Sequence, residues 1–592
     1  MHLLNVLAVA FVVVVTLLAG TLGVRRARTT GDFYVASRSV SPRWNAAAIG
    51  GEYLSAASFL GVAGLVLAFG VDMLWYPVCY TAGYLVLLAL VAAPLRRSGA
   101  YTLPDFAQIR LGSPTVRRLA SGLVVLIGWL YLVPQLQGAA LAFRTQTGAP
   151  GWTGGLVVAG VVLVAVAVGG MRSITFAQAL QFWLKLLALL IPVLVLVGVW
   201  HHRGDTLGDG HPRAAVTSTV TIASTTTVRV PVAETLVVSG RVDGQRVDGR
   251  VRLSTGEHTF VGGTQVTLQR GDVVPVAASL PAQRTGSWLQ PLGSGVDHPL
   301  YATLSLILAI CLGTMGLPHV LVRFYTNPDG RDARRTTLGV LVLLSLFYLL
   351  PTVLGVLGRH YVPDLLLTGN TDATVLTLPG RMIEGQAGVV LGALVTAGAF
   401  AAFLSTASGL TVSVAGVLSQ DLFDPLLRRR RRPHRSKNAT DPRAGRIRMF
   451  RLAAIVAIAV PYLLSLPSAH LGLAATVGLA FAVAAATFCP LLVLGIWWPR
   501  LTDLGAIAGL VWGGVLATAA VLVTITMNVG GWFGALLAQP AAWAVPSTFV
   551  VIVGVSLASP RRVPTTTGRV MVRLHAPESL VADLAAVDRS SY

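Results

Sequence analysis

Thirteen apolar runs divide the chain, and each is close to the length of about 20 residues that crosses a bilayer as a helix. Polar loops separate most of the runs, and only the second run holds an acidic residue well inside it. The pattern predicts an all-α polytopic membrane protein with thirteen transmembrane helices. The runs lie at about residues 3–23, 44–70, 72–95, 117–143, 153–170, 178–200, 299–322, 337–357, 387–417, 450–467, 472–497, 504–527 and 541–558.

One long segment between these runs follows a different pattern. Residues 201–298 are rich in Thr, Val and Gly, and apolar and polar positions alternate in VTSTVTIASTTTVRVPV and LVVSGRVDGQRVDGRVRL. Alternation with a period of two between Gly-rich turns is typical of β-strands. We predict a small extracellular β-rich insert with a structural or envelope-contact role.

Two runs contain residues that weaken a helix inside the membrane. The second run holds Gly50, Gly51 and Glu52 near its middle, and the seventh holds Gly313 and Pro318. Interrupted spans at matching places in two halves of a chain are typical of the central site of a transporter. A small-residue packing face around a neutral Glu52 remains the alternative for the second run. Because the two runs are five apart, spans two to six and seven to eleven would form two five-helix repeats of opposite orientation.

The chain then divides into six parts. They are an extra N-terminal helix with its loop, a first repeat, the insert, a second repeat, two C-terminal helices and a cytoplasmic tail. These parts cover residues 1–43, 44–200, 201–298, 299–498, 499–560 and 561–592.

Composition and charge agree with a membrane protein. Of the 592 residues, 54% are hydrophobic and 12% are charged, against about 25% charged in a soluble chain. The net charge of +21 would suggest nucleic-acid binding, but the arginines lie in short loops. Cytoplasmic loops are enriched in Lys and Arg, which predicts a plasma-membrane protein with its N-terminus outside and its C-terminus in the cytoplasm. The basic run at residues 428–432 is then a topology anchor in contact with membrane lipid, and no nucleic-acid partner is expected.

Hydroxyl side chains in the ninth run are the candidate cation ligands. Ser405 and Thr406 interrupt a helix of small apolar residues. Their oxygens could ligate a hard cation, or they could bond back to the helix carbonyl four residues earlier. The residues alone favour neither reading.

Four stretches carry a family resemblance, and their order and spacing match the family over about residues 1–560. They are GDFYVASRSVSPRWNAAAIGGEYLSAASFLGVAG at 31–64, SGAYTLPDFAQIRL at 98–111, LGTMGLPHVLVRFYTNPDGRDARR at 312–335 and FLSTASGLTVSVAGVLSQDLF at 403–423. The chain resembles the sodium/solute symporter family, and within it the acetate and monocarboxylate permease (cation/acetate symporter) branch. The resemblance implies the leucine-transporter-like inverted-repeat fold with one extra helix before the repeats.

The resemblance also implies a Na+ site between the second and ninth spans, where carbonyls of the broken helix and hydroxyls of its partner hold the ion. Alignment on SFLGVAG places carbonyl ligands on Gly51 and Leu54. Alignment on SQDLF places a carbonyl on Ala402 and the paired hydroxyls on Ser405 and Thr406. The intact Ser–Thr pair favours Na+ as the coupling ion, and no other cofactor is expected.

In this fold the substrate lies where spans two and seven unwind, beside span four. No arginine is evident at mid-span, so neutral donors would have to hold a short carboxylate. The candidates are Tyr53, Ser55, Ser58, Tyr131, Gln135 and Thr314.

Three further polar residues lie in or beside apolar runs. Glu52 is the coupling candidate: it either relays a proton or supports the unwound helix by accepting backbone N–H bonds. Lys185 is expected to snorkel to the cytoplasmic surface. His319, directly after Pro318, is expected to be structural at a helix break.

These features predict a secondary active transporter and not an enzyme. No HExxH, GxSxG or Walker pattern is present, and such motifs are what an intramembrane hydrolase or a nucleotide-driven pump would need. The expected activity is Na+-coupled uptake of acetate, propionate or pyruvate by alternating access. Transport of proline, a sugar or another family solute, and proton coupling, remain the alternatives.

Overall fold

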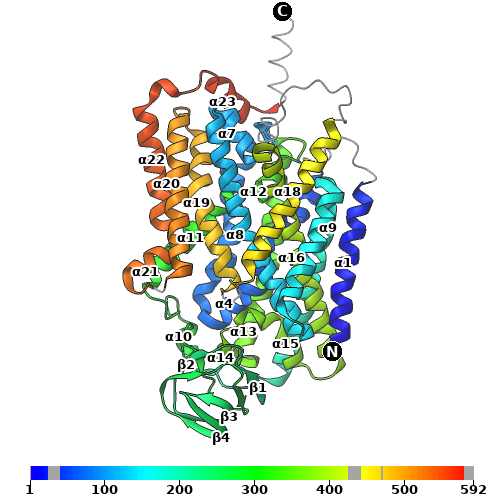
Figure 1. Cartoon of the computed structure of the whole chain (residues 1–592), viewed down its shortest axis with the longest axis vertical. Coiled ribbons are helices and arrows are strands. Elements are labelled where there is room, and N and C mark those ends of the chain that lie inside the picture. The colour runs from blue at the N-terminus through cyan, green and yellow to red at the C-terminus, as the bar shows by residue number, and fades with distance from the viewer. Residues whose placement is uncertain (1, 25–39, 424–441, 469–470, 528, 579–592) are drawn as a thin grey trace, which may run out of the picture.

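The structure is a computed structural model that describes residues 2–24, 40–423, 442–468, 471–527 and 529–578. Figure 1 shows a body of long helices that run side by side, with a small β module at one end. Within the described residues, eleven helical segments are long and apolar enough to cross a membrane. The basic run at residues 428–432 lies outside the described residues.

The number of predicted spans is not confirmed, and the difference from thirteen has two causes. The apolar part of α1 covers only Leu3–Ala19, which is shorter than the eleven segments. The predicted second and third spans do not form two uninterrupted helices, because the second is broken and its later part continues into the third as one apolar segment, Ala57–Leu90.

The predicted break in the second span is confirmed. Helix α3 (Pro42–Tyr53) ends where Leu54 adopts φ −72° and ψ 87°, and helical structure resumes at a π-turn, η2 (Ala57–Gly61), followed by α4 (Val62–Phe69). Glycine lowers helix propensity by about 1 kcal/mol relative to alanine. It also allows close packing here, since a Cβ on Gly51 would lie 2.1 Å from the carbonyl oxygen of Gln178.

The seventh span is also broken, as predicted. Helix α11 (Pro299–Gly313) passes into a 3-10 turn, η4 (Thr314–Gly316), and α12 (Pro318–Phe324) begins after Leu317. Pro318 disfavours the helical region for the residue before it, and Leu317 accordingly has an extended ψ of 112°.

The remaining helices complete the body. Helix α9 contains two candidate spans, Gly151–Val168 and Ser173–Arg203. The helices are α1 (His2–Val24), α5 (Trp75–Leu90), α6 (Ala92–Arg97), α7 (Leu103–Leu111), α8 (Pro114–Thr147), α9 (Gly151–Arg203), α10 (Thr285–Trp288), α13 (Gly330–Tyr361), α14 (Leu365–Thr368), α15 (Thr374–Met382), α16 (Gln386–Val417), α18 (Pro442–Ser465), α19 (Leu473–Trp497), α20 (Asp503–Thr526), α21 (Gly531–Ala538), α22 (Ala541–Ala558) and α23 (Thr567–His575).

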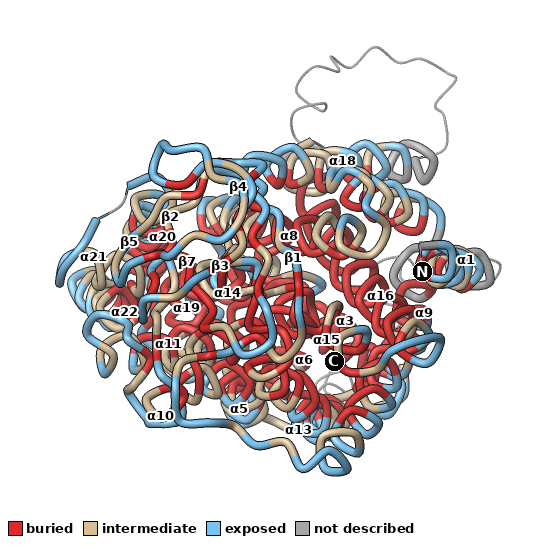
Figure 2. The backbone as a smooth tube through the Cα atoms, turned by 90° about the horizontal axis from the view of Figure 1, so that it is seen from below, coloured by how far each residue is buried: buried red, intermediate tan, exposed pale blue. Residues whose placement is uncertain are grey.

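Buried residues concentrate in the middle of the helical body, as Figure 2 shows. Every residue of α16 from Val395 to Val417 is buried, and the helix packs against α9, α8 and α1. Both α3 and α13 also pack against one another and against α9. The first part of the broken helix, α3, therefore lies beside the long buried stretch of α16.

The predicted β-rich insert contains a seven-stranded antiparallel sheet with the order β1-β6-β3-β5-β2-β7, and β4 pairs with β3. Inward side chains such as Val238, Phe260 and Val266 form its own apolar core. The strands are β1 (Ser218–Thr221), β2 (Thr226–Val230), β3 (Glu234–Val242), β4 (Gln245–Leu253), β5 (Gly256–Phe260), β6 (Gln265–Leu268) and β7 (Val276–Ala277).

The first part of the predicted cytoplasmic tail is a packed helix. In α23, Leu574 is fully buried, and the Thr567 hydroxyl accepts a hydrogen bond from Arg110 at 3.2 Å. Arg110 is itself buried. Its guanidinium also donates to the carbonyl oxygens of Gly495 and Trp498 at the end of α19, so its charge has partners inside the protein.

Trp288 fixes the insert to the broken helix. Its indole N–H donates to the carbonyl oxygens of Val66 and Leu67, at 2.8 and 3.2 Å, at the end of α4. The side chain is 1% exposed, and the guanidinium of Arg359 lies 5.4 Å from its ring centroid. A loosely attached module would not bury so large a side chain in the helical body.

Replacement of Trp288 by alanine should therefore destabilise the protein by about 3–5 kcal/mol, the usual cost of truncating a buried aromatic residue. Thermal unfolding in detergent measures the change. Trp152→Ala is the matched control, because Trp152 is 53% exposed. Equal melting temperatures for the two variants would show that the Trp288 contact does not stabilise the protein.

Candidate functional site at the helix breaks

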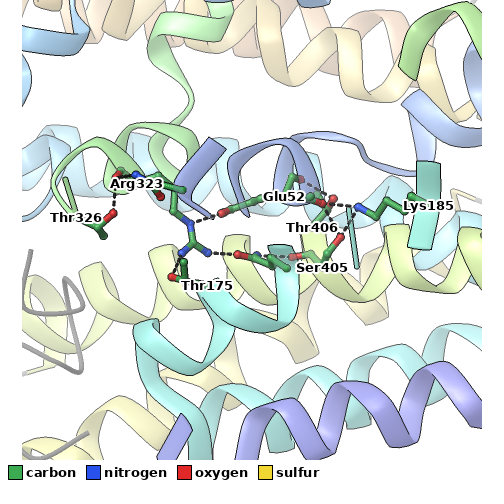
Figure 3. Close-up of polar contacts among 10 residues, drawn as sticks. Glu52, Thr175, Lys185, Arg323, Thr326, Ser405 and Thr406 are labelled. Carbon is green, nitrogen blue, oxygen red and sulfur yellow. Dashed lines mark hydrogen bonds and ion pairs between the residues drawn. The ribbon is translucent and has the colours of Figure 1, made fainter. Parts of the chain in front are cut away.

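The break between α3 and α4 leaves backbone carbonyl groups without helical partners, and hydroxyl groups of α16 donate hydrogen bonds to them. The Ser405 hydroxyl lies 2.7 Å from the Gly51 carbonyl oxygen and 3.1 Å from that of Ala402. The Thr406 hydroxyl donates to the Glu52 carbonyl oxygen at 2.6 Å. Ser405 and Thr406, two of the residues named from the sequence as cation ligands, thus lie against the end of α3 (Figure 3).

The side-chain ammonium of Lys185, on α9, lies among these oxygens. It donates to the Leu54 carbonyl oxygen at 2.8 Å, to the Ser405 hydroxyl at 2.5 Å and to the Gly51 carbonyl oxygen. Lys185 is fully buried. The prediction that it snorkels to the membrane surface is wrong, because the carbonyls freed by the helix break supply its acceptors inside the protein.

Glu52 and Arg323 form a buried ion pair beside this cluster. The two side chains are 2% and 1% exposed, and the Arg323 Nε lies 2.6 Å from Glu52 Oε2. Arg323 also donates to the Thr175 hydroxyl and to the side-chain oxygen of Gln178. The amide nitrogen of Gln178 donates in turn to the Ser405 carbonyl oxygen at 2.7 Å. One network therefore connects α3, α9, α12 and α16.

Arg323 was not expected at this site from the sequence. It directly follows the seventh apolar run, at residues 299–322, where arginines of short loops are found. The short helix α12 instead keeps Arg323 inside the protein, five residues after Pro318. A buried charge needs a partner, and the isolated acid in the second run was the signal that could have led to it.

Helix α16 packs closely against the Glu52 side chain at Gly409. A Cβ on Gly409 of α16 would lie 1.9 Å from Glu52 Oε1. The carboxylate is thus held between α16 and Arg323. The partner that the structure gives this carboxylate is the arginine side chain.

The predicted substrate residues lie at or beside the two helix breaks, and most of them have partners within the protein. Tyr53 joins the two helix breaks, because its hydroxyl lies 3.1 Å from the Thr314 hydroxyl of η4. Gln135 accepts a hydrogen bond from the backbone N–H of Ala56 at 2.8 Å, so it supports the break. Ser58 pairs with the Tyr348 hydroxyl at 2.8 Å. Ser55 is buried in the interrupted segment itself.

An aromatic cluster surrounds the same place. The rings of Tyr80 and Tyr84 lie 5.9 and 4.9 Å from that of Tyr53, and Tyr131 stacks on His319 at 5.1 Å. Within the described part of the chain, the buried polar atoms that have no hydrogen-bond partner include both tyrosine hydroxyls and both ring nitrogens of His319. The two hydroxyls and the one N–H group of a neutral imidazole are therefore free donors of the site. The sequence reading omitted Tyr80 and Tyr84 and treated His319 as structural.

Two interrupted helices that meet at a buried polar centre define the class of the protein: a membrane transporter with a central site. The chain belongs to the sodium:solute symporter family, whose family model matches residues 33–513. This confirms the family expected from the sequence.

Proteins of similar sequence include a transporter and a symporter. The chain is 28% identical to a monocarboxylic acid transporter of Corynebacterium glutamicum, with 91% of this chain and 86% of that protein covered. It is 27% identical to an uncharacterized symporter of Bacillus subtilis, with 88% and 85% covered.

Solved structures agree on the fold. A substrate-bound, outward-open Na+-coupled sialic acid symporter matches with a TM-score of 0.59 at 14% identity, and covers 93% of this chain and 97% of its own. Mhp1, a nucleobase-cation-symport-1 family transporter, matches with a TM-score of 0.52 at 12% identity, and covers 92% and 99%. These likenesses establish a transporter fold, while the five-plus-five repeat and the orientation of the termini stay predictions.

The buried ion pair gives a stability prediction. Glu52→Gln should lower the free energy of unfolding by about 3–5 kcal/mol, because it leaves the Arg323 charge buried without its partner. The double variant Glu52→Gln with Arg323→Gln should recover part of the loss, since no uncompensated charge remains. Thermal unfolding in detergent measures both.

The control for this prediction is the exposed pair Arg229–Glu257 of the β module, whose side chains are 46% and 55% exposed. Removal of Glu257 should cost no more than about 1 kcal/mol. If Glu52→Gln were as mild as Glu257→Gln, the buried pair would not support the site as described.

Proposed function

We propose that the protein takes up short monocarboxylates such as acetate, propionate or pyruvate, coupled to a cation gradient, by alternating access. The observation that carries the proposal is the set of unpartnered polar groups beside the helix breaks, the hydroxyls of Tyr80 and Tyr84 and the imidazole of His319. The similarity to a monocarboxylic acid transporter supports the same substrate class.

A short carboxylate matches the chemistry of this place. Its two oxygens accept several hydrogen bonds, and hydroxyl and imidazole N–H groups can donate them. Its small apolar part suits the rings that enclose the site, among them Phe481, whose centroid lies 5.4 Å from that of Tyr80 and 5.9 Å from that of Tyr131. A buried polar group gains most from a partner where water is excluded.

The formal charges around the site favour an anion. Lys185 and Arg323 are positive and Glu52 is negative, which leaves one positive charge in excess. A monovalent anion balances this charge, whereas a neutral sugar or a zwitterionic amino acid does not. The excess charge therefore favours a monocarboxylate over proline or a sugar.

The helix breaks supply the moving parts. The hydrogen bond between Tyr53 and Thr314 joins the two breaks directly. A substrate that binds beside this bond contacts both broken helices at once, so it can shift the balance between states in which those helices pack differently. We infer that occupation of the site is sensed at this contact.

Labelled acetate uptake into proteoliposomes tests the proposed activity. An inward Na+ gradient and an inward proton gradient are imposed separately, and accumulation under either one supports cation-coupled symport. Propionate and pyruvate should compete, while proline and glucose should not. Competition by proline or glucose alone would move the protein to another substrate class, and no uptake under either gradient would overturn the proposal.

The free donors give a second test. Tyr80→Phe and His319→Ala should each raise the KM for acetate about tenfold, the effect of losing one hydrogen bond to a charged group. Tyr462→Phe is the matched control, because its hydroxyl contacts the Trp152 carbonyl oxygen outside the site. Unchanged KM values in both site variants would exclude these groups from substrate binding.

A further inference from the structure

We propose that the ammonium group of Lys185 is itself the resident cation of the site between α3 and α16, so that transport does not require Na+ there. The inference deepens the proposed function, and rests on it only for the solute with which transport is measured. It follows from the position of one side chain relative to three oxygens.

The hydrogen bonds of Lys185 are complete. A lysine ammonium has three N–H donors and no acceptor. Its three partners are the carbonyl oxygens of Gly51 and Leu54 and the hydroxyl of Ser405. All three are oxygens that the family resemblance assigns to a Na+ ion. The ammonium therefore occupies three of the five ligands that the resemblance assigns to Na+.

The backbone is shaped to bring α9 to this place. A Cβ on Gly51 would lie 2.1 Å from the Gln178 carbonyl oxygen, and a Cβ on Gly50 would lie 3.0 Å from the Phe182 ring. The two glycines let α9 approach α3 closely, and Lys185 lies one turn beyond Phe182 on the same helix. The approach that puts the ammonium among the oxygens is thus built into both helices.

The charges also exclude a second cation. Glu52 is the acidic side chain that acts on Lys185, and its carboxylate is already paired with Arg323. The partner helix α16 has hydroxyls but no charged residue. A Na+ ion bound to the same oxygens would lie next to the ammonium, and the described residues place no unpaired carboxylate there to offset the repulsion of the two cations. The residues present therefore do not fit Na+ while Lys185 is in position.

A cation attached to the chain can hold two helices together as a bound ion can. It holds the unwound segment of α3 against α16, through Gly51 and Leu54 on one side and Ser405 on the other. Unlike Na+, it is present at full occupancy whatever the ion concentration. The packing of the broken helix is therefore independent of external Na+.

Acetate counterflow tests the inference without a driving gradient. Proteoliposomes loaded with unlabelled acetate take up labelled acetate in media that contain Na+, K+ or N-methyl-D-glucamine at one pH and ionic strength. We expect rates within threefold of one another. A larger fall when Na+ is removed would overturn the inference.

Thermal unfolding in detergent gives an answer that does not depend on the substrate. Wild-type protein should show the same melting temperature in NaCl and in KCl. Lys185→Ala keeps the oxygens and removes the ammonium, so it should melt at a lower temperature in KCl and regain stability as NaCl is added. Gln181→Ala, one turn earlier on α9, is the control and should show no Na+ effect.

The outcomes separate the two proposals. Saturable stabilisation of wild-type protein by Na+, abolished by Ser405→Ala, would overturn the assignment of Lys185 even if acetate is transported. Absence of acetate counterflow in every medium would overturn the proposed function, while the melting temperatures still decide the role of Lys185. If Lys185→Ala does not fold, the wild-type comparison of NaCl with KCl decides alone.

Discussion

The structure depends on one constraint: a helix broken inside a membrane exposes backbone groups that water cannot satisfy. At the break between α3 and α4, the N–H of Ala56 donates to the side chain of Gln135, and the carbonyl of Glu52 accepts from the hydroxyl of Thr406. The carbonyls of Gly51 and Leu54 accept hydrogen bonds from Lys185. Helices α8, α9 and α16 each contribute a partner, so the break fixes which helices must pack around it.

The charged residues follow from the same constraint. An ammonium among carbonyl oxygens brings a positive charge into the interior, and the Glu52–Arg323 pair beside it brings two more charges that nearly cancel. Buried charges persist only where partners hold them. The glycines at the contacts are part of this arrangement, because a side chain at Gly409 would collide with Glu52. The site is thus a consequence of backbone geometry as much as of side-chain chemistry.

Sequence reasoning predicted what depends on local pattern. The apolar runs, the two breaks and the β insert each leave a signal within one continuous stretch of the sequence. Lys185 and Arg323 were misread because their partners are distant: Lys185 contacts residues more than 130 positions away, and Arg323 pairs with a residue 271 positions away. Snorkelling and loop charge are rules for a residue that faces lipid or water. Neither rule applies once a broken helix supplies acceptors in the interior.

The insert shows how the same broken helix is constrained at its other end. Its Trp288 donates to the last carbonyls of α4, and a Cβ on Gly70, where φ is +80°, would lie 2.0 Å from the Trp288 carbonyl oxygen. Asp72 accepts from the backbone N–H groups of Leu292 and Ser294. Helix α4 is therefore held by the insert at one end, while the break beside it is held by Lys185 and α16. Any rearrangement of α4 must move the segment around Trp288 with it, so envelope contact alone is too narrow a description of the insert.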